Sequence, residues 1–170
     1  VKKSIAVILE NLKNFPDIDL FVLRNHITGI EKNKNFIDLN QIIAKGTNKP
    51  GNSLINLIDN YNYFRPTAWN FIFRSEFLKM NSIYFNKSMR TYEDCPFVAK
   101  AICASNKYKI IEKPVYIYQR YNPNSLSVTT GFICVMSNLK IIYELFSFIK
   151  KEKNTLNKKK LKFLLAIIEK

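Results

Sequence analysis

The interpretation of this chain depends on Thr91-Tyr-Glu-Asp-Cys-Pro-Phe97, a stretch that carries two adjacent carboxylates. Glu93 and Asp94 precede apolar residues at helical spacing, so they are predicted to lie where a loop becomes a helix. Backbone N–H groups without partners and the positive end of the helix dipole favour an ionised carboxylate there. Such a carboxylate is able to accept a proton.

A purely structural interpretation of the same stretch stays open. Thr91 and Asp94 have the spacing of a capping box, and Pro96 suits a first helical turn. Helix N-termini are common, whereas catalytic acids are rare. The stretch alone therefore does not decide between a helix cap and a catalytic pair.

The composition indicates one globular domain, because 47% of the 170 residues are hydrophobic and 14% are aromatic. The chain opens on Val1 without a leader sequence, and we expect it to be a piece of a longer protein. The most apolar stretch, residues 131–149, is interrupted by Asn138, Lys140 and Glu144. We therefore expect no transmembrane segment.

The formal net charge of +14 is compatible with nucleic acid, with anionic lipid or phosphorylated ligands, and with a basic surface that has no specific partner. Most cations are lysines, and the few arginines are scattered, unlike clustered base or phosphate readers. The three cysteines are odd in number and lack metal-ligand spacing, which favours reduced thiols in the cytoplasm.

Hydrophobic periodicity predicts alternating helices and strands up to about residue 120. Helices are expected over 4–12, 53–63, 76–81 and about 94–106, and strands over 20–23, 33–39, 68–74, 107–112 and 115–120. Asp17 and Asp19 precede a buried strand, whereas metal-binding acid pairs in α/β sheets follow one. We interpret this pair as a turn that starts the strand.

Residues 131–170 are predicted to form an amphipathic helical tail. Its first helix has one apolar stripe: Phe132, Val135, Met136, Leu139, Ile142, Tyr143 and Phe146. A basic connector and a second amphipathic helix follow. We expect the tail to pack on the preceding domain as a helix pair, and additional contact with the inner leaflet of a membrane stays open.

Three motifs in order resemble the second half of bacterial glycosyltransferase family 2 enzymes, which have the GT-A fold. They are Trp69-Asn-Phe-Ile-Phe-Arg74-Ser-Glu-Phe-Leu78, Tyr92-Glu-Asp-Cys-Pro-Phe97, and Pro114-Val-Tyr-Ile-Tyr-Gln-Arg120 followed by Asn124-Ser-Leu-Ser127. The resemblance covers about residues 1–130. It implies an α/β fold, the C-terminal, acceptor-side part of a GT-A mixed sheet flanked by helices, with residues 131–170 as a helical tail.

The resemblance implies an inverting glycosyltransferase of the hexosyltransferase type. The donor would be a nucleotide-diphosphate sugar, and the acceptor a glycan or lipid-linked molecule of bacterial surface polysaccharide, capsule or lipo-oligosaccharide synthesis. Asp94 would be the general base and Glu93 would orient it or bind acceptor hydroxyls. The expected substrate-binding residues are Trp69, Asn70, Arg90, Arg120, Ser125 and Ser127.

The same resemblance implies a divalent cation, Mn²⁺ or Mg²⁺, whose ligands would lie mostly upstream of Val1. Tyr121 and Asn122 stand where many relatives carry a metal-binding histidine, so we predict no metal ligand in this chain. By itself the chain is expected to be inactive. The expected location is the cytoplasm, with peripheral contact to the inner membrane as the alternative stated above.

A different class of function stays open as an alternative: a basic nucleic-acid-binding or non-catalytic interaction module. Its motivation is the charge, together with aromatic residues interleaved with lysines over residues 108–121. The sequence lacks signatures of common nucleic-acid-binding folds, and we expect no specific nucleic acid partner.

Overall fold

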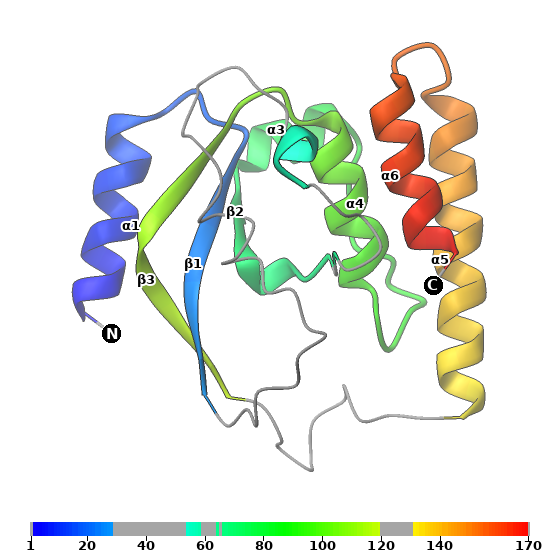
Figure 1. The fold of residues 1–170 in the computed structure, drawn as a ribbon, viewed down its shortest axis with the longest axis horizontal. Helices are drawn as coiled ribbons and strands as arrows, with labels where there is room; N and C mark the ends of the chain where they lie inside the picture. Colours follow the sequence, from blue (N-terminus) through cyan, green and yellow to red (C-terminus); the bar gives the residue numbers. More distant parts are fainter. Residues whose placement is uncertain (1, 29–53, 59–63, 65, 120–130, 170) are drawn as a thin grey trace.

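The central strand of the sheet is β1, Leu20–Thr28, which pairs with a different partner on each side. On one side it is antiparallel to β2, Phe71–Phe73, and on the other it is parallel to β3, Tyr108–Gln119. The structure is a computed structural model that describes residues 2–28, 54–58, 64, 66–119 and 131–169. Within these residues the fold is mixed α/β, a three-stranded mixed sheet flanked by helices (Figure 1).

Alternation along β1 explains why both faces of the sheet are covered. Leu20 and Val22 point into the main core, whereas Phe21 and Leu23 point to the opposite face. Helix α1, Lys2–Asn14, covers that opposite face. The predicted N-terminal helix and first strand are thus confirmed, and both elements are longer than expected.

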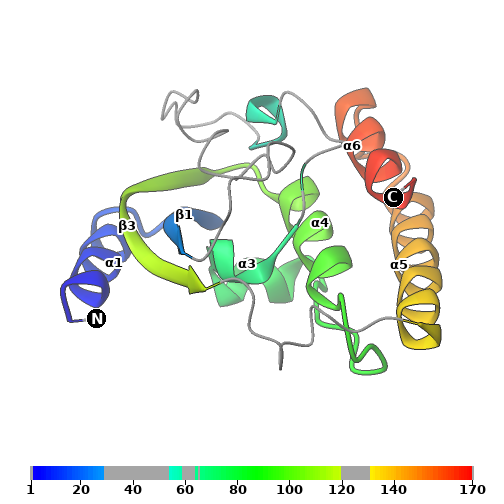
Figure 2. The same ribbon diagram turned by 60° about the horizontal axis from the view of Figure 1, so that its bottom comes forward.

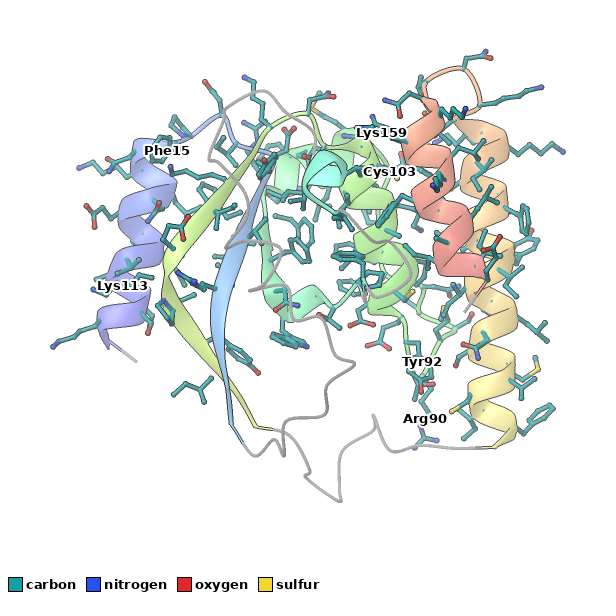
Figure 3. The ribbon with its side chains drawn as sticks, in the orientation of Figure 1. Phe15, Arg90, Tyr92, Cys103, Lys113 and Lys159 are labelled. Carbon is teal, nitrogen blue, oxygen red and sulfur yellow. The ribbon has the colours of Figure 1, made fainter. Side chains whose placement is uncertain are left out.

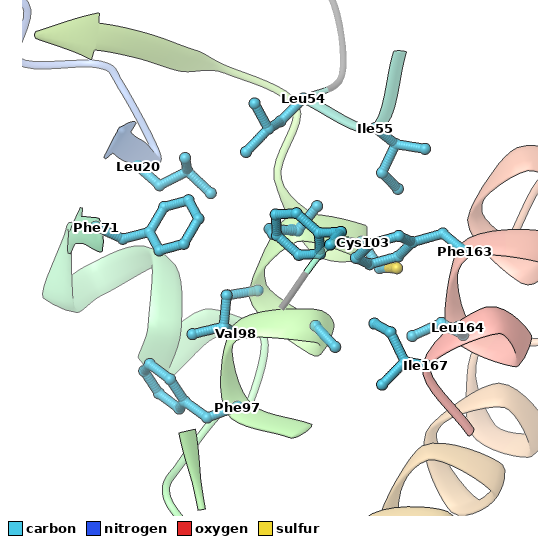
Figure 4. Packing of buried hydrophobic residues seen from close by; sticks show 14 of the residues in the cluster. Leu20, Leu54, Ile55, Phe71, Phe97, Val98, Cys103, Phe163, Leu164 and Ile167 are labelled. Atoms are coloured by element: carbon cyan, nitrogen blue, oxygen red, sulfur yellow. The ribbon is translucent and has the colours of Figure 1, made fainter. Parts of the chain in front are cut away.

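The main core lies between the sheet and α4, Asp94–Ala104, and extends to the C-terminal helices. Figure 4 shows Leu20 and Phe71 from the sheet facing Val98 of α4, with Phe163 and Leu164 beyond them. These last two residues belong to α6, Lys158–Ile168, which packs beside α5, Phe132–Lys151. Figure 2 shows α5 and α6 as the outermost layer on the side away from α1.

The segment predicted as one strand over 68–74 has two parts. Ala68–Asn70 is a short 3₁₀ turn, η2, and only Phe71–Phe73 is extended. The Asn70 backbone N–H donates to the Thr67 carbonyl at 3.2 Å, and the Asn70 amide donates to the Thr67 hydroxyl at 2.6 Å. These local hydrogen bonds replace those of an extended strand, so the prediction was wrong at residues 68–70.

The two strands predicted around Pro114 are one strand, β3. Its pairing with β1 shifts register there, because Leu23 faces Ile111 whereas Asn25 faces Tyr116. Extra residues on β3 therefore bulge at the proline, which has no N–H to donate to the ladder.

The remaining helices are short. Helix α3, Ser75–Met80, begins one residue earlier than predicted, with Arg74 and not Ser75 at its N-cap. Of the helix predicted over 53–63, the described part is a 3₁₀ turn, η1, Leu54–Leu57. The strand predicted over 33–39 lies outside the described residues.

Candidate active site

The η2 turn and the N-terminus of α4 meet on the side of the sheet that leads towards the carboxyl ends of the parallel strands β1 and β3. Because Val22 pairs with Phe71, the η2 turn that precedes β2 lies towards the carboxyl end of β1. Helix α4 leads into β3 from the opposite end of the sheet, so its N-terminus also lies on this side (Figure 1). Ligands of open α/β sheets bind at this edge.

Asp94, the first residue of α4, connects the helix to the η2 turn. One carboxylate oxygen, Oδ2, accepts a hydrogen bond from the Ala68 backbone N–H at 3.3 Å. The Asp94 side chain is only partly buried, so the structure leaves it accessible. Sequence reasoning missed Ala68 as a partner because a backbone donor leaves no mark in the choice of side chain.

Opposing effects act on the ionisation of Asp94. Burial raises the pKa of Asp94 above its ordinary value, and the neighbouring charge of Glu93 adds to the rise. The backbone N–H groups of Ala68, Asp94 and Cys95 act in the opposite direction, with Ala68 the strongest of them. The net result is a raised pKa, which makes Asp94 a stronger base than an exposed aspartate once it is ionised.

The first turns of α4 give this carboxylate a rigid support. Seven residues of the helix are buried: Pro96, Phe97, Val98, Ala99, Ala101, Ile102 and Cys103. The ring of Phe97 stacks on Phe85 with centroids 3.9 Å apart and meets the edge of Phe73 at 5.2 Å. A catalytic group needs such support to keep its geometry.

The turn before α4 has an unusual backbone. Tyr92 has φ of 60°, a left-handed conformation that is rare for a bulky residue other than glycine. The Cys95 N–H donates to the Tyr92 carbonyl at 3.1 Å, which closes the turn around both acids. Strained backbone of this kind clusters at functional sites. No signal in the sequence indicated it, because tyrosine is not a typical left-handed residue.

The predicted capping box is not formed. Glu93 is at the N-cap of α4 and makes no side-chain capping bond. The Thr91 hydroxyl instead lies 2.9 Å from that of Ser137 on α5, in a buried hydrogen bond. Thr91 therefore tethers the acid-bearing turn to the C-terminal helix pair, and Ser137 is a contributor that the sequence did not reveal.

The other predicted site residues differ from one another in position and in burial. Trp69 of η2 is partly exposed and stacks on Tyr116 of β3, with ring centroids 5.5 Å apart. Asn70 is 5% exposed, so its burial indicates a part in shaping the turn. Arg90 is exposed and lines an open hollow of about 260 Å³ with residues of α5, including Phe132 and Met136 (Figure 3).

The structure thus brings Glu93, Asp94 and the η2 turn together and leaves Arg90 beside α5. Their roles in binding stay predictions. Arg120, Ser125 and Ser127 lie outside the described residues. A second hollow lies between α3 and the ends of α4, α5 and α6, and Asp94 lines neither of these two hollows.

No cluster of three or more His, Cys, Asp or Glu side chains able to hold a metal exists among the described residues. Asp19 has structural partners: its carboxylate accepts the backbone N–H groups of Asn106 and Lys107 at 2.9 and 3.0 Å and pairs with Arg74 at 3.5 Å. The described residues therefore do not fit a divalent cation, and the cation expected for a longer protein stays a prediction.

Comparison with known proteins gives one partial similarity. The chain is 34% identical over 60 residues to a protein of Bacillus subtilis (strain 168) described as the uncharacterized glycosyltransferase EpsJ. The aligned stretch covers 35% of this chain and 17% of that protein. No family model and no solved structure matches the chain. The chain is therefore distantly similar, in part, to a bacterial glycosyltransferase.

Proposed function

We propose that this chain is the acceptor-side part of an inverting glycosyltransferase, with Asp94 as its general base. The observation that carries the proposal is the position of Asp94: a partly exposed carboxylate at a helix N-terminus, held by Ala68, on the side of the sheet towards the carboxyl ends of the parallel strands. The partial similarity to a bacterial glycosyltransferase supports the same class of reaction.

The proposed reaction needs a base because a sugar hydroxyl is a poor nucleophile. Asp94 accepts the proton of the acceptor hydroxyl while the hydroxyl oxygen forms a bond to the anomeric carbon of the donor. The bond from that carbon to the diphosphate breaks on the opposite face, and the nucleoside diphosphate leaves with the electron pair. A positioned base contributes about 10²–10⁴ in rate.

The surroundings of Asp94 suit this role. The carboxylate accepts the Ala68 N–H through Oδ2 and is partly exposed, and in this proposal it also accepts the substrate hydroxyl. Glu93, one residue earlier, holds acceptor hydroxyls or orients Asp94. The stacked pair of Trp69 and Tyr116 offers an aromatic wall for a sugar ring. The role of Glu93 and that of the aromatic pair can each be tested by substitution.

The parts that this chain does not supply belong to the proposal as well. A nucleotide-binding half with a site for Mn²⁺ or Mg²⁺ would precede Val1. From this chain, Arg120, Ser125 and Ser127 would approach the diphosphate held there. The products would be surface glycans of a bacterium, made at the cytoplasmic side of its membrane.

The test uses the full-length protein as its gene encodes it. Purified protein is incubated with UDP-, GDP- and dTDP-sugars and a glycolipid extract, and release of nucleoside diphosphate is measured with and without extract. We expect acceptor-dependent release for at least one donor and its loss in Asp94→Asn. Asp17→Asn, the same change at an exposed aspartate in the turn before β1, is the matched control. No acceptor-dependent release from any donor, or equal release by Asp94→Asn, would overturn the proposal.

A further inference from the structure

Helix α5 has apolar residues on two opposite faces, and only one of them is packed. The face that carries Ser137, Ile141 and Leu145 is buried, and the two aliphatic residues belong to the main core. The opposite face carries six exposed apolar side chains, which we call the outer stripe: Phe132, Val135, Met136, Leu139, Tyr143 and Phe146. The sequence prediction placed these residues on one stripe correctly, and the helix pair packs on the domain as expected, but α5 packs through the face opposite the stripe.

The outer stripe is continuous along the helix. Its members follow the spacing i, i+3, i+4, i+7, i+11 and i+14, which keeps them on one face over about four turns. The exposed fraction of these six side chains ranges from 38% for Met136 to 76% for Phe132. Scattered apolar residues on a surface need no explanation, but a contiguous patch of this kind marks an interaction site.

The segment that carries the outer stripe has a positive net charge. Residues 131–169 contain eight lysines and three glutamates, a difference of five. Lys150 lies 18 residues after Phe132, five helical turns, and so continues the line of the stripe. Arg90 is exposed beside the N-terminal end of α5 (Figure 3). Of the glutamates, Glu144 is paired with Lys100 at 2.8 Å, so its charge is balanced locally.

We propose that the outer stripe of α5 lies in the interface of an anionic lipid bilayer, with the helix parallel to the membrane plane. A helix with an apolar face and flanking lysines binds there, because the apolar side chains enter the boundary between headgroups and acyl chains and the cations attract anionic headgroups. The net charge of +14 complements such a surface over the chain as a whole.

A parallel orientation follows from the packing of α5 even though the helix is long and apolar enough to cross a membrane. Glu144, near the middle of the helix, accepts hydrogen bonds from Asn86 at 2.5 Å and from Lys100 at 2.8 Å. Leu145 is fully buried in the main core. A spanning orientation would break these contacts and would carry Lys140 and Glu144 into the hydrocarbon.

Membrane binding would also bear on the candidate active site. Ser137, on the packed face of α5, holds Thr91 and with it the turn that carries Asp94. The helix in the interface would therefore be joined to the acid-bearing turn by a buried hydrogen bond and would keep that turn near lipid-linked acceptors. This consequence rests on the proposed function, whereas the binding itself does not.

The test measures co-sedimentation of the full-length protein with vesicles of phosphatidylcholine alone and of phosphatidylcholine mixed with phosphatidylglycerol. We expect binding to the anionic vesicles, little binding to the neutral ones, and weaker binding at high salt. The double variant Leu139→Glu/Tyr143→Glu changes two exposed positions and is expected to lower the partition coefficient about tenfold or more. Its unfolding temperature is compared with that of the parent to verify folding.

The matched control is Ile5→Glu/Leu9→Glu, which places the same charges on exposed apolar residues of α1. The control and Asp94→Asn are expected to bind anionic vesicles like the parent, so a failure of the proposed function would leave this result intact. Equal binding to neutral and anionic vesicles, or unchanged binding by the Leu139/Tyr143 variant, would overturn the proposal. So would a dimer in vesicle-free solution that this variant dissociates, because a second copy would then cover the stripe.

Discussion

The hydroxyl groups of Thr91 and Ser137 form a buried hydrogen bond of 2.9 Å between residues 46 positions apart in the chain. Both residues are at most 5% exposed. Through this bond the turn that precedes Asp94 is fixed to α5, and the position of the candidate base depends on a helix far along the sequence.

A double-mutant cycle tests this bond. Thr91→Val removes one partner and leaves the Ser137 hydroxyl buried without it, which is expected to cost about 1–3 kcal/mol of unfolding free energy. The double variant Thr91→Val/Ser137→Ala removes both groups, so it is expected to cost about 1 kcal/mol less than the sum of the single variants. Urea unfolding of the four proteins measures this. Additive costs would mean that the two hydroxyls do not interact.

The ion pair of Lys100 and Glu144 joins α4 to α5 in a mostly buried setting, with side-chain exposures of 14% and 16%. Glu144→Ala leaves the lysine charge without its partner and is expected to cost about 3 kcal/mol. Glu112→Ala at the exposed pair with Arg24 is the control, for which a cost below about 1 kcal/mol is expected. Denaturant unfolding measures the loss of unfolding free energy in both variants. Similar losses would contradict the expected difference between the mostly buried ion pair and the exposed one.

The left-handed backbone of Tyr92 predicts a reversal of the usual preference for alanine over glycine. At φ of 60° glycine avoids the steric cost that alanine meets, so Tyr92→Gly is expected to be about 1 kcal/mol more stable than Tyr92→Ala. At Tyr143, exposed on α5, the order should be opposite by about the same amount. Thermal unfolding of the four variants measures both differences. The same order at both positions would exclude the left-handed turn.

The raised pKa of Asp94 predicts how its substitution changes stability with pH. Burial makes the folded protein bind this proton more tightly than the unfolded chain, so the associated stability is present at low pH and is lost as the pH rises through the folded pKa. Asp94→Asn cannot ionise and is therefore expected to be more stable than the parent at pH 7. The difference should vanish near about pH 3, below the ordinary pKa of about 3.9. Urea unfolding at both pH values measures it, and a less stable variant at pH 7 would contradict the prediction.

The elements that the sequence predicted well are those with a strong local period. The apolar run of β1 and the helical spacing in α4 and α5 depend on neighbours a few residues away. The start of α4 at Asp94 followed from the same pattern. The continuous apolar run at the start of β1 predicted a buried strand, and Leu20 to Leu23 are all buried.

What the sequence did not predict depends on distant partners or on unusual backbone. The η2 turn replaces a strand because Thr67 and Asn70 bond to each other, and Thr91 forgoes a capping box because Ser137 is within reach. The outward direction of the α5 stripe could not be inferred from its period, because periodicity shows that residues share a face but not what lies opposite that face.

The central claim of the proposed function is that the Asp94 carboxylate removes a proton from the acceptor hydroxyl. The most direct measurement is the turnover of Asp94→Asn in the full-length protein. The asparagine keeps the size of the side chain and a carbonyl oxygen for the Ala68 N–H, but it cannot accept the proton. We predict that kcat falls about 10² or more while the variant stays folded. A folded Asp94→Asn protein with a kcat close to that of the parent would contradict the account.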